Sequence, residues 1–355
     1  MTGKTVRVNV GKGYDVIIEN GILNACGKIL REVIGNGRAA IITDSNVSKL
    51  YLKTVFNALK NENIDCESFV FEAGEQSKNI STLSEILEFL AEKQFVRSDT
   101  VIALGGGVTG DMAGFAAAVY LRGIKFIQIP TTLLAAVDSS VGGKTAIDLC
   151  AGKNLAGAFK QPEAVICDPE VFSTLPQKEF ANGMAETIKY GVLFSEDLFD
   201  SFNNNTTPDQ LCEMIEKCVS FKARTVEHDE FDNGERKLLN LGHTIGHAIE
   251  KCSNFTVSHG YAVAAGMAMI ARASEALKTA KEGTAKRIEA VLKKYSLPTD
   301  FDFTSDELTS AALSDKKRSG NKITLVLPTE IGKCILKDEP IEKLEEYIKL
   351  GKENN

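Results

Sequence analysis

The segment TVIALGGGVTGDMAGFAAAV, residues 100–119, decides the fold class of this chain. Its apolar, β-branched start, Thr100–Leu104, predicts a buried strand, and its small-residue end, Met112–Val119, predicts a helix. Between them, GGGVTG matches the G-x-G-x-x-G pattern in a strand–turn–helix setting. Glycines let the backbone approach a pyrophosphate, and the first turn of a helix offers it free N–H groups. The segment therefore predicts a dinucleotide-binding turn, with a tightly packed structural turn as the alternative.

The surroundings of this turn differ from those of a standard Rossmann fingerprint. The acidic residue expected about 20 positions later is replaced by Pro130-Thr131-Thr132. An earlier predicted strand, Ala39–Thr43, ends in Asp44. A carboxylate there either holds a ribose hydroxyl or caps the following helix, and the residues leave both roles open.

Strands and helices alternate in the first half of the chain, which predicts a mostly parallel sheet. The predicted strands are Ala39–Thr43, Ser68–Phe71, Thr100–Leu104, Lys125–Ile129 and Ala164–Cys167, and the helices include Val47–Lys60 and Ile80–Lys93. The second half is helical over Glu179–Leu193, Asp209–Glu227, Glu235–Cys252, Ala262–Thr279 and Ala285–Tyr295, with one strand-like run, Lys322–Leu327. The change falls near Asp168–Pro176, so we expect two domains, residues 1–170 and 171–355, and a surface loop over Asn203–Asp209.

Composition and charge restrict the class of protein. The 355 residues are 43% hydrophobic and 25% charged, with a net charge of −7; this excludes a disordered chain and argues against a general nucleic-acid binder. The eight cysteines form no C-x-x-C pair, so we expect free thiols in a reducing cytoplasm. No apolar run reaches about 18 residues, so no membrane span is expected, and Met1–Val10 lacks a signal-peptide core.

Three of the four histidines fall in a short stretch of the second half. His243 and His247 are four residues apart on a helical pattern and share a face, and Asn240 is expected on the same face. His259 follows just before the next helix. This arrangement is typical of a divalent metal site, although the spacing does not decide which histidines would bind the metal. Ordinary histidines on a helix face are the alternative.

Glu186 is a candidate carboxylate ligand because it lies among small and apolar residues in GMAETIKYG, residues 183–191. Lys189 follows one helical turn later, so a surface i, i+3 ion pair is the alternative. Three protein ligands would leave a coordination position open for a substrate oxygen.

Two segments combine glycine with lysine: VDSSVGGKTA, residues 137–146, and Gly152-Lys153-Asn154. The first lacks P-loop spacing, because Asp138 occupies the position of the first glycine. Glycines beside lysines suit an anion near a domain boundary, where α/β proteins often bind ligands. Solvated surface lysines are the alternative.

Together, these motifs resemble those of the 3-dehydroquinate synthase family. The matching strings occur in the family's order and span roughly residues 10–340: GEQ at 74–76, LGGGVTGD at 104–111, PTTLL at 130–134, VDSSVGGKT at 137–145, GKN at 152–154, ETIKYG at 186–191, NLGHTIGHAIE at 240–250 and HG at 259–260. Two positions in the nucleotide loop depart from the pattern: Ala73, where relatives often carry Asp, and Ser77, where an aromatic residue is common.

The resemblance implies an α/β N-terminal NAD-binding domain, Rossmann-like with a mostly parallel sheet, and an all-α C-terminal metal-binding domain, with the active site in the cleft between them. It implies conversion of 3-deoxy-D-arabino-heptulosonate 7-phosphate to 3-dehydroquinate and phosphate, step two of the cytoplasmic shikimate pathway. The steps would be transient oxidation by NAD, β-elimination of phosphate, reduction, ring opening and an intramolecular aldol reaction. The implied cofactors are NAD and Zn²⁺ or Co²⁺. The implied assembly is a homodimer that binds a small sugar phosphate and neither nucleic acid nor a membrane.

The resemblance also implies roles for residues that match the family's motifs. The implied metal ligands are Glu186, His243 and His259. The residues implied in catalysis are Lys144, Lys153, Asn154, Lys189, Arg236, Asn240 and His247. The residues implied in substrate binding are Asp138, Lys222, one of Lys316 and Lys317, and Arg122, which would reach the phosphate from the partner subunit. The residues implied in NAD binding are Asp44, Glu75, Lys78, Gly106, Gly107, Val108, Asp111, Thr131 and Thr132, together with Lys144 and Lys153.

Three other functions fit parts of the pattern. A sister cyclase of the same fold would act on another sugar phosphate to form a 2-deoxy-scyllo-inosose or valiolone-type ring, or on an amino-substituted heptulosonate. A metal-dependent polyol dehydrogenase would release NADH and would need fewer phosphate-binding residues. A catalytically silent regulatory protein would not need the complete set of ligands and lysines.

Overall fold

The computed structural model describes residues 3–204, 207–316 and 321–352. The chain forms two compact units. The α/β unit contains Met1–Leu175 and Thr207–Glu230, and the helical unit contains Pro176–Thr206 and Phe231–Asn355. The chain therefore returns to the α/β unit once before it ends in the helical unit. The expected division into residues 1–170 and 171–355, which contains no such return, stays a prediction.

The α/β unit is built on a seven-stranded sheet of order β1-β2-β9-β6-β5-β3-β4. β1 runs antiparallel to β2, and the other neighbouring pairs are parallel. The sheet confirms the predicted, mostly parallel α/β fold, and its central strands are apolar runs because both faces are covered. The strands are β1 (Lys4–Val8), β2 (Tyr14–Ile18), β3 (Ala39–Asp44), β4 (Cys66–Phe71), β5 (Thr100–Gly105), β6 (Lys125–Pro130) and β9 (Ala164–Cys167).

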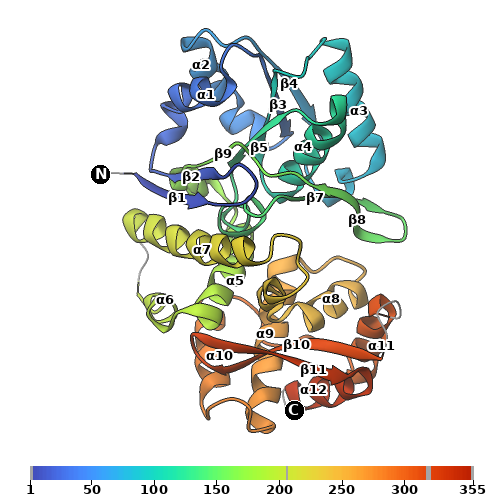
Figure 1. Cartoon of the computed structure of the whole chain (residues 1–355). Helices are drawn as coiled ribbons and strands as arrows, with labels where there is room; N and C mark the ends of the chain where they lie inside the picture. Colours follow the sequence, from blue (N-terminus) through green and yellow to red (C-terminus); the bar gives the residue numbers. More distant parts are fainter. Residues whose placement is uncertain (1–2, 205–206, 317–320, 353–355) are drawn as a thin grey trace. The chain divides into compact units, whose positions relative to one another are not determined.

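Helices cover both faces of this sheet: Figure 1 shows α1 and α2 on one side of the strands and α3 and α4 on the other. A hairpin of β7 (Lys144–Leu149) and β8 (Gly152–Phe159) packs against α4. The helices are α1 (Gly27–Ile34), α2 (Lys53–Asn61), α3 (Ile80–Glu92), α4 (Gly107–Val119) and α7 (Pro208–His228). The shorter helical turns are η1 (Ile22–Asn24), η2 (Ser48–Leu52), η3 (Glu75–Ser77), η4 (Tyr120–Arg122), η5 (Ala135–Ser139) and η6 (Pro169–Thr174).

The helix after the glycine-rich turn begins at Gly107, five residues before the predicted start at Met112. Close packing requires a glycine at position 105, the last residue of β5, because a Cβ there would lie 2.3 Å from Oγ1 of Thr109. Strand β5 and helix α4 therefore follow each other almost directly. The free N–H groups of the first helical turn lie at the end of the sheet.

The helical unit is organised around α9 (His259–Ala276), which contacts α5, α8, α10 and α12. Small residues along α9 let its neighbours approach closely: a Cβ at Gly266 would lie 2.1 Å from the carbonyl oxygen of Gly242. The other helices are α5 (Gln177–Phe194), α6 (Glu196–Ser201), α8 (His243–Cys252), α10 (Thr284–Lys294), α11 (Ser305–Lys316) and α12 (Leu344–Gly351), with the 3₁₀ turns η7 (Glu235–Asn240) and η8 (Ile341–Lys343).

Two details of the predicted helical unit are wrong. The predicted helix Glu235–Cys252 is interrupted at Gly242, whose φ of 78° lies in the left-handed region that favours glycine. Asn240 therefore lies outside α8. The unit also contains a hairpin of β10 (Lys322–Glu330) and β11 (Lys333–Pro340). Strand β11 is largely exposed and charged, so its sequence lacks the apolar alternation of a strand.

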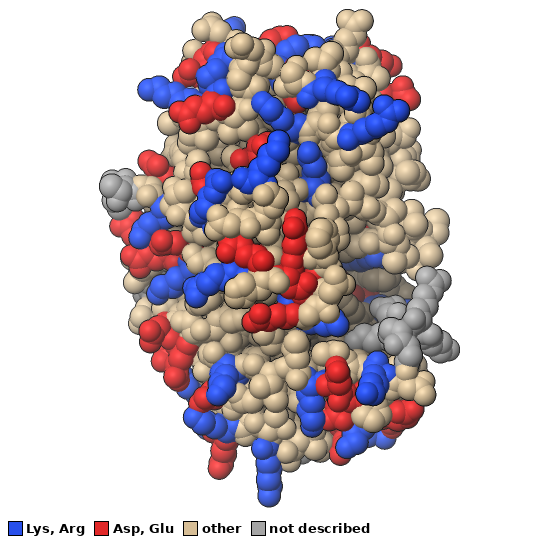
Figure 2. Space-filling view, in the orientation of Figure 1, with Lys and Arg blue, Asp and Glu red and all other residues tan. Residues whose placement is uncertain are grey.

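The surface carries mixed charge. Figure 2 shows lysine and arginine interspersed with aspartate and glutamate over the visible face. All eight cysteines are free thiols, as predicted. None of the helices in the described part of the chain has the length and apolar character needed to cross a membrane.

Candidate functional site

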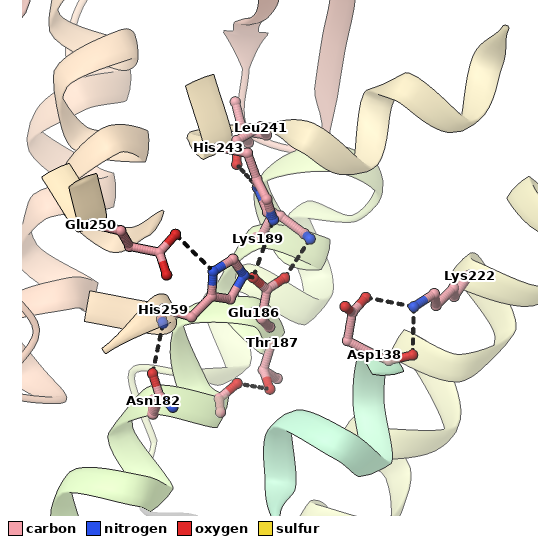
Figure 3. Close-up of polar contacts among 12 residues, drawn as sticks. Asp138, Asn182, Glu186, Thr187, Lys189, Lys222, Leu241, His243, Glu250 and His259 are labelled. Carbon is pink, nitrogen blue, oxygen red and sulfur yellow. Dashed lines mark hydrogen bonds and ion pairs between the residues drawn. The ribbon is translucent and has the colours of Figure 1, made fainter. Parts of the chain in front are cut away.

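Three side chains of the helical unit converge on one centre. Glu186 lies on α5, and His243 and His259 are the first residues of α8 and α9. The Nε2 atoms of His243 and His259 lie 3.7 and 3.4 Å from Oε1 of Glu186. Figure 3 shows both imidazoles directed at this carboxylate from their separate helices. The fold thus assembles the predicted carboxylate and two of the three candidate histidines.

The i, i+3 ion pair expected as the alternative role of Glu186 is also present, but it is buried and not on the surface as predicted. Lys189, one turn later on α5, contacts Oε2 of Glu186, and both side chains are buried. Buried charges require such pairing. Because Lys189 contacts Oε2 and the histidines face Oε1, the ion pair and a metal site are compatible.

The second ring nitrogen of each histidine has a hydrogen-bond acceptor. Nδ1 of His243 lies 3.1 Å from the carbonyl oxygen of Leu241, and Nδ1 of His259 lies 3.5 Å from Oε2 of Glu250. An acceptor at Nδ1 favours a proton there, so Nε2 is the nitrogen of each ring that can bind a metal once it carries no proton. Metal-ligating histidines typically have this arrangement.

The two histidines differ in charge. Burial lowers the pKa of His243 to about 3, and the nearby charge of Lys189 contributes to this. Burial also opposes charge on His259, but hydrogen bonds to Glu186 and Glu250 outweigh it and raise the pKa of His259 to about 10. In the metal-free protein at neutral pH, His243 is therefore neutral and His259 is protonated.

The donor set fits a divalent transition metal. Ligand atoms of Glu186, His243 and His259 all lie within 4.8 Å of one another. Ligands at about 2.1 Å from a tetrahedral zinc ion lie about 3.4 Å apart, so small side-chain shifts suffice to coordinate one. One carboxylate with two imidazoles suits Zn²⁺ or Co²⁺ and leaves a coordination position for substrate.

Metal binding is expected to release protons in a pH-dependent way. The metal must displace the proton of His259, whereas His243 has none to lose. We therefore expect about one proton released per Zn²⁺ at pH 7.5, measured by calorimetry in buffers of different ionisation enthalpy.

The same proton affects the stability of the metal-free protein. The raised pKa of His259 contributes stability that is complete below the usual pKa of 6.5 and is lost as the pH rises towards 10. For the proton release itself, the assignment of one proton to His259 is tested by the number released. Release of no proton, or of two, would contradict this assignment.

His247 lies beside this centre but is exposed on the next turn of α8. Its ring centroid is 5.5 Å from that of His243 and 6.1 Å from that of His259. A second group of potential ligand atoms, from His247, Glu250 and His259, also lies within 4.8 Å. Each group contains one buried carboxylate, Glu186 or Glu250. In the first group, His243 and His259 both face one oxygen of Glu186.

In the α/β unit, the two threonines that follow β6 lie against the glycine-rich turn. The N–H of Thr131 donates to the carbonyl oxygen of Gly105 at 2.9 Å. Cγ2 of Thr132 lies 3.0 Å from the position of a Cβ on Gly106. Both threonines thus lie beside the first turn of α4, where N–H groups are free to bind an anion.

Asp44, at the end of β3, has the capping role that its position allows, and the role of holding a ribose hydroxyl stays a prediction. Oδ1 accepts hydrogen bonds from the N–H groups of Asn46 and Val47, each at 2.9 Å, and so caps the turn before η2. Oδ2 accepts from the hydroxyl of Thr109 on α4 at 3.4 Å. The second oxygen therefore faces the helix that follows the glycine-rich turn.

Lys78 joins residues predicted separately for nucleotide and substrate. Its Nζ lies 2.5 Å from Oδ2 of Asp111 on α4 and 2.5 Å from Oδ1 of Asn154 on β8. Burial raises the pKa of Asp111 to about 6, against the opposing charge of Lys78. Glu75 and Lys153 form a longer, more exposed pair, 3.7 Å between Oε1 and Nζ.

Asp138 and Lys222 are paired within the α/β unit, on η5 and α7. Nζ of Lys222 lies 2.9 Å from Oδ1 of Asp138 and also donates to its main-chain carbonyl oxygen (Figure 3). Lys222 is buried, so this ion pair holds a cation that is shielded from solvent. Lys144, by contrast, is exposed at the start of β7.

The remaining candidates are distributed over both units. Arg122 is exposed on η4 of the α/β unit. In the helical unit, Arg236 is buried on η7, and Asn240, which ends η7, is exposed. Lys316 is the last residue of α11, and Lys317 lies outside the described residues.

Comparison with known proteins decides the family. Profiles described as 3-dehydroquinate synthase N-terminal and 3-dehydroquinate synthase C-terminal match residues 68–182 and 183–318. The 3-dehydroquinate synthase of Clostridium acetobutylicum is 44% identical over 351 residues, which cover 97% of this chain and 98% of that protein. The chain belongs to the 3-dehydroquinate synthase family. A second relative supports this assignment. The 3-dehydroquinate synthase of Streptococcus gordonii is 41% identical over 343 residues, which cover 95% of this chain and 97% of that protein. The predicted family and its phosphate-eliminating lyase function are thus confirmed.

Solved structures share the fold over nearly the whole chain. A 2-deoxy-scyllo-inosose synthase, solved with carbaglucose-6-phosphate, NAD⁺ and Co²⁺, is 26% identical with a TM-score of 0.86 and covers 98% of this chain and 99% of its own. The 2-epi-5-epi-valiolone synthase of Streptomyces hygroscopicus, solved with NAD⁺ and Zn²⁺, is 24% identical with a TM-score of 0.87 and covers 95% of this chain and 96% of its own. These likenesses confirm the fold class predicted for the 3-dehydroquinate synthase family.

Two groups that contact the histidines were not predicted from the sequence. They are the carboxylate of Glu250 and the main-chain carbonyl of Leu241. The carbonyl has no sequence signal, because any residue offers one. Glu250 has a signal: with His243 and His247 it forms an i, i+4, i+7 series, which lies on one face of a helix.

Proposed function

We propose that this chain converts 3-deoxy-D-arabino-heptulosonate 7-phosphate to 3-dehydroquinate and inorganic phosphate. The observation that carries the proposal is the convergence of Glu186, His243 and His259 in a chain whose curated relatives are named for this activity. Those relatives are 41% and 44% identical, whereas the cyclase solved with a different sugar phosphate analogue is 26% identical. The reaction breaks the C–O bond to phosphate and the C–O bond that closes the sugar ring, forms one C–C bond in the aldol step, and leaves no net oxidation.

NAD and a divalent metal, Zn²⁺ or Co²⁺, supply reversible hydride transfer and polarisation of substrate oxygens. The presence of NAD⁺ and Co²⁺ in the related 2-deoxy-scyllo-inosose synthase supports both cofactors, as does the donor set of the helical unit. The proposed metal ligands are Glu186, His243 and His259. The residues proposed to bind NAD are Asp44, Glu75, Lys78, Gly106–Val108, Asp111, Thr131, Thr132, Lys144 and Lys153.

The substrate carries a carboxylate and a phosphate, so its binding requires cations. Lys189, Arg236 and Lys222 are 1%, 3% and 5% exposed, and charges shielded from water interact more strongly with an anion. We assign substrate binding and neutralisation of the departing phosphate to these residues with Lys144, Lys153 and one of Lys316 and Lys317. Asp138, Asn154, Asn240 and His247 would orient hydroxyl groups. The phosphate itself would accept the proton removed in the elimination.

Arg122 is proposed to reach the phosphate bound by the partner subunit of a homodimer. Its φ of 66° is strained for a residue with a side chain, and such strain is concentrated at functional positions. Val119 and Leu121 beside it are 42% and 41% exposed, an apolar surface that a second copy would cover. A cytoplasmic location is proposed with it, supported by the eight free thiols, which persist in a reducing compartment.

Subunit complementation tests the role of Arg122. Arg122→Ala and Glu186→Gln are each expected to be nearly inactive alone. If Arg122 acts on the partner's substrate, a mixed dimer of the two variants contains one intact set of residues. Equal mixing and reassociation should then restore about a quarter of the wild-type activity. Activity that stays at the level of the separate variants, with mixed dimers verified by mass spectrometry, would place Arg122 outside the partner's site.

The activity itself is tested with metal-loaded protein, NAD⁺ and 3-deoxy-D-arabino-heptulosonate 7-phosphate. Inorganic phosphate and absorbance at the NADH band are followed together. Stoichiometric phosphate release without NADH accumulation supports the proposal. No release, with metal and NAD⁺ both bound, would favour a sister cyclase, and steady NADH accumulation would favour a polyol dehydrogenase.

A further inference from the structure

Glu250 is a buried carboxylate that the proposed metal and substrate sets do not use. It is 4% exposed and lies on α8, two turns after His243. Its Oε2 lies 3.5 Å from Nδ1 of His259, and Oε1 of Glu186 lies 3.4 Å from Nε2 of the same ring. The imidazole of His259 thus lies between two carboxylates, one at each nitrogen (Figure 3).

We infer that Glu250 is a positioning residue that fixes His259 as a metal ligand by accepting the hydrogen bond of its Nδ1–H. The inference rests on the metal site of the proposed function. A carboxylate at Nδ1 holds the ring in one tautomer and one orientation, and it makes the opposite nitrogen a stronger electron donor. Glu250 acts through His259 and needs no contact with metal or substrate.

The comparison with His243 shows why the charge of Glu250 matters. The Nδ1 of His243 faces a neutral acceptor, the carbonyl of Leu241, at 3.1 Å. His243 is held by the tight turn that Gly242 makes directly before it, at the start of α8. His259 begins α9 and is 34% exposed at its side chain, against 13% for His243. The more exposed ligand therefore has the charged partner, which supplies the orientation that packing supplies for His243.

A buried carboxylate is costly unless hydrogen bonds or opposite charge compensate it, and His259 is one such partner of Glu250. The opposite interpretation is that Glu250 is itself a ligand, because His247, Glu250 and His259 also have donor atoms within 4.8 Å. That interpretation predicts either a second ion, and so two metals per chain, or a single ion at this group, whose binding would survive His243→Ala.

The test compares Glu250→Gln with a matched control in the full-length protein. Glutamine keeps the shape and an acceptor oxygen but removes the charge. The control is Glu339→Gln, which alters another buried glutamate of the helical unit whose partner is Lys337 at 2.7 Å. Zinc affinity is measured by competition with a chromophoric chelator, metal content by mass spectrometry, and ligand geometry by the visible spectrum of the Co²⁺-loaded protein.

We expect wild-type protein to bind one metal per chain and Glu250→Gln to bind zinc about 10- to 100-fold more weakly, with altered Co²⁺ bands. Glu339→Gln should match the wild type in both readouts. Wild-type zinc affinity and spectrum in Glu250→Gln, in a protein that is otherwise active, would overturn the inference and leave the proposed function standing. Two metals in the wild type and one in Glu250→Gln would overturn it in favour of a ligand role.

A second variant keeps the inference testable if Glu250→Gln does not fold. Glu250→Asp retains the charge and withdraws the carboxylate by one methylene, so the hydrogen bond to His259 lengthens. We expect a smaller loss of zinc affinity with the Co²⁺ bands displaced in the same sense. Unchanged affinity and bands in this variant would also overturn the inference. A wild type without any tight metal site would remove the proposed function as well.

Discussion

His243→Ala is expected to abolish turnover and to reduce zinc affinity by more than about 100-fold. Losing residues that only support a metal ligand reduces affinity by up to about 100-fold. His243 is a direct ligand in the proposed site, so its loss should exceed theirs. Burial lowers the pKa of His243 to about 3, so its removal changes no buried charge in the metal-free protein. Zinc affinity and phosphate release are measured on the same preparation.

Glu186→Gln should lose turnover equally but for an additional reason. It removes a ligand and also leaves the ammonium of Lys189, 1% exposed, without its carboxylate. Breaking a buried pair costs about 3–5 kcal/mol of folding free energy, so this variant should also unfold more readily. His228→Ala, on the exposed end of α7, is the control and should retain both metal and activity. Wild-type turnover in metal-stripped protein, or in His243→Ala, would contradict the metal site.

Lys78→Met is expected to lower the free energy of unfolding by about 3 kcal/mol, the typical cost of removing one partner of a buried ion pair. Lys78 is 5% exposed, and its ammonium contacts Asp111 and Asn154, each at 2.5 Å. Without the lysine, the carboxylate of Asp111 stays in a poorly solvated position. Urea unfolding in the absence of NAD measures the loss.

Two further measurements make this prediction specific. The matched control is Lys153→Met, whose ion pair to Glu75 is 3.7 Å long and more exposed, and which should cost less than about 1 kcal/mol. The second measurement is the pH dependence of the free energy of unfolding. Burial already raises the pKa of Asp111 to about 6, and the loss of Lys78 raises this pKa further. The variant should therefore be least stable at pH 8 and recover as the pH falls towards 5 and Asp111 is protonated. A loss independent of pH, or equal in both variants, would refute the pairing argument.

The parallel sheet and the glycine-rich turn could be predicted because their signals are local. Strands of a parallel sheet are buried on both faces, so they are continuous apolar runs that can be recognised in the sequence. Ala39–Thr43 and Lys125–Ile129 are two such runs. The glycine pattern depends on steric contacts within a few residues, such as that between Gly105 and Thr109. The resemblance to the family added the roles of individual residues to this local information.

Other features depend on contacts between distant segments and could not be predicted. The sequence showed that Glu186 had two roles open to it, but only the packing of α5 against α9 directs Oε1 at the histidines and leaves Oε2 to Lys189. The interruption at Gly242 follows from a close approach between α8 and α9. Strand β11 forms because β10 pairs with it, and its own residues carry no strand pattern.

The sequence by itself determined which residue types are available: a glycine-rich turn after a buried strand, three histidines in a short stretch of the second half, and lysines beside glycines. The tertiary structure alone decided which of them meet. It pairs Asp138 with Lys222 by returning α7 to the α/β unit, and it sets His259 between Glu186 and Glu250. The physical reason is that periodicity and steric demand act over a few residues, whereas a metal centre needs donor atoms within about 4 Å from helices that only the folded core brings together.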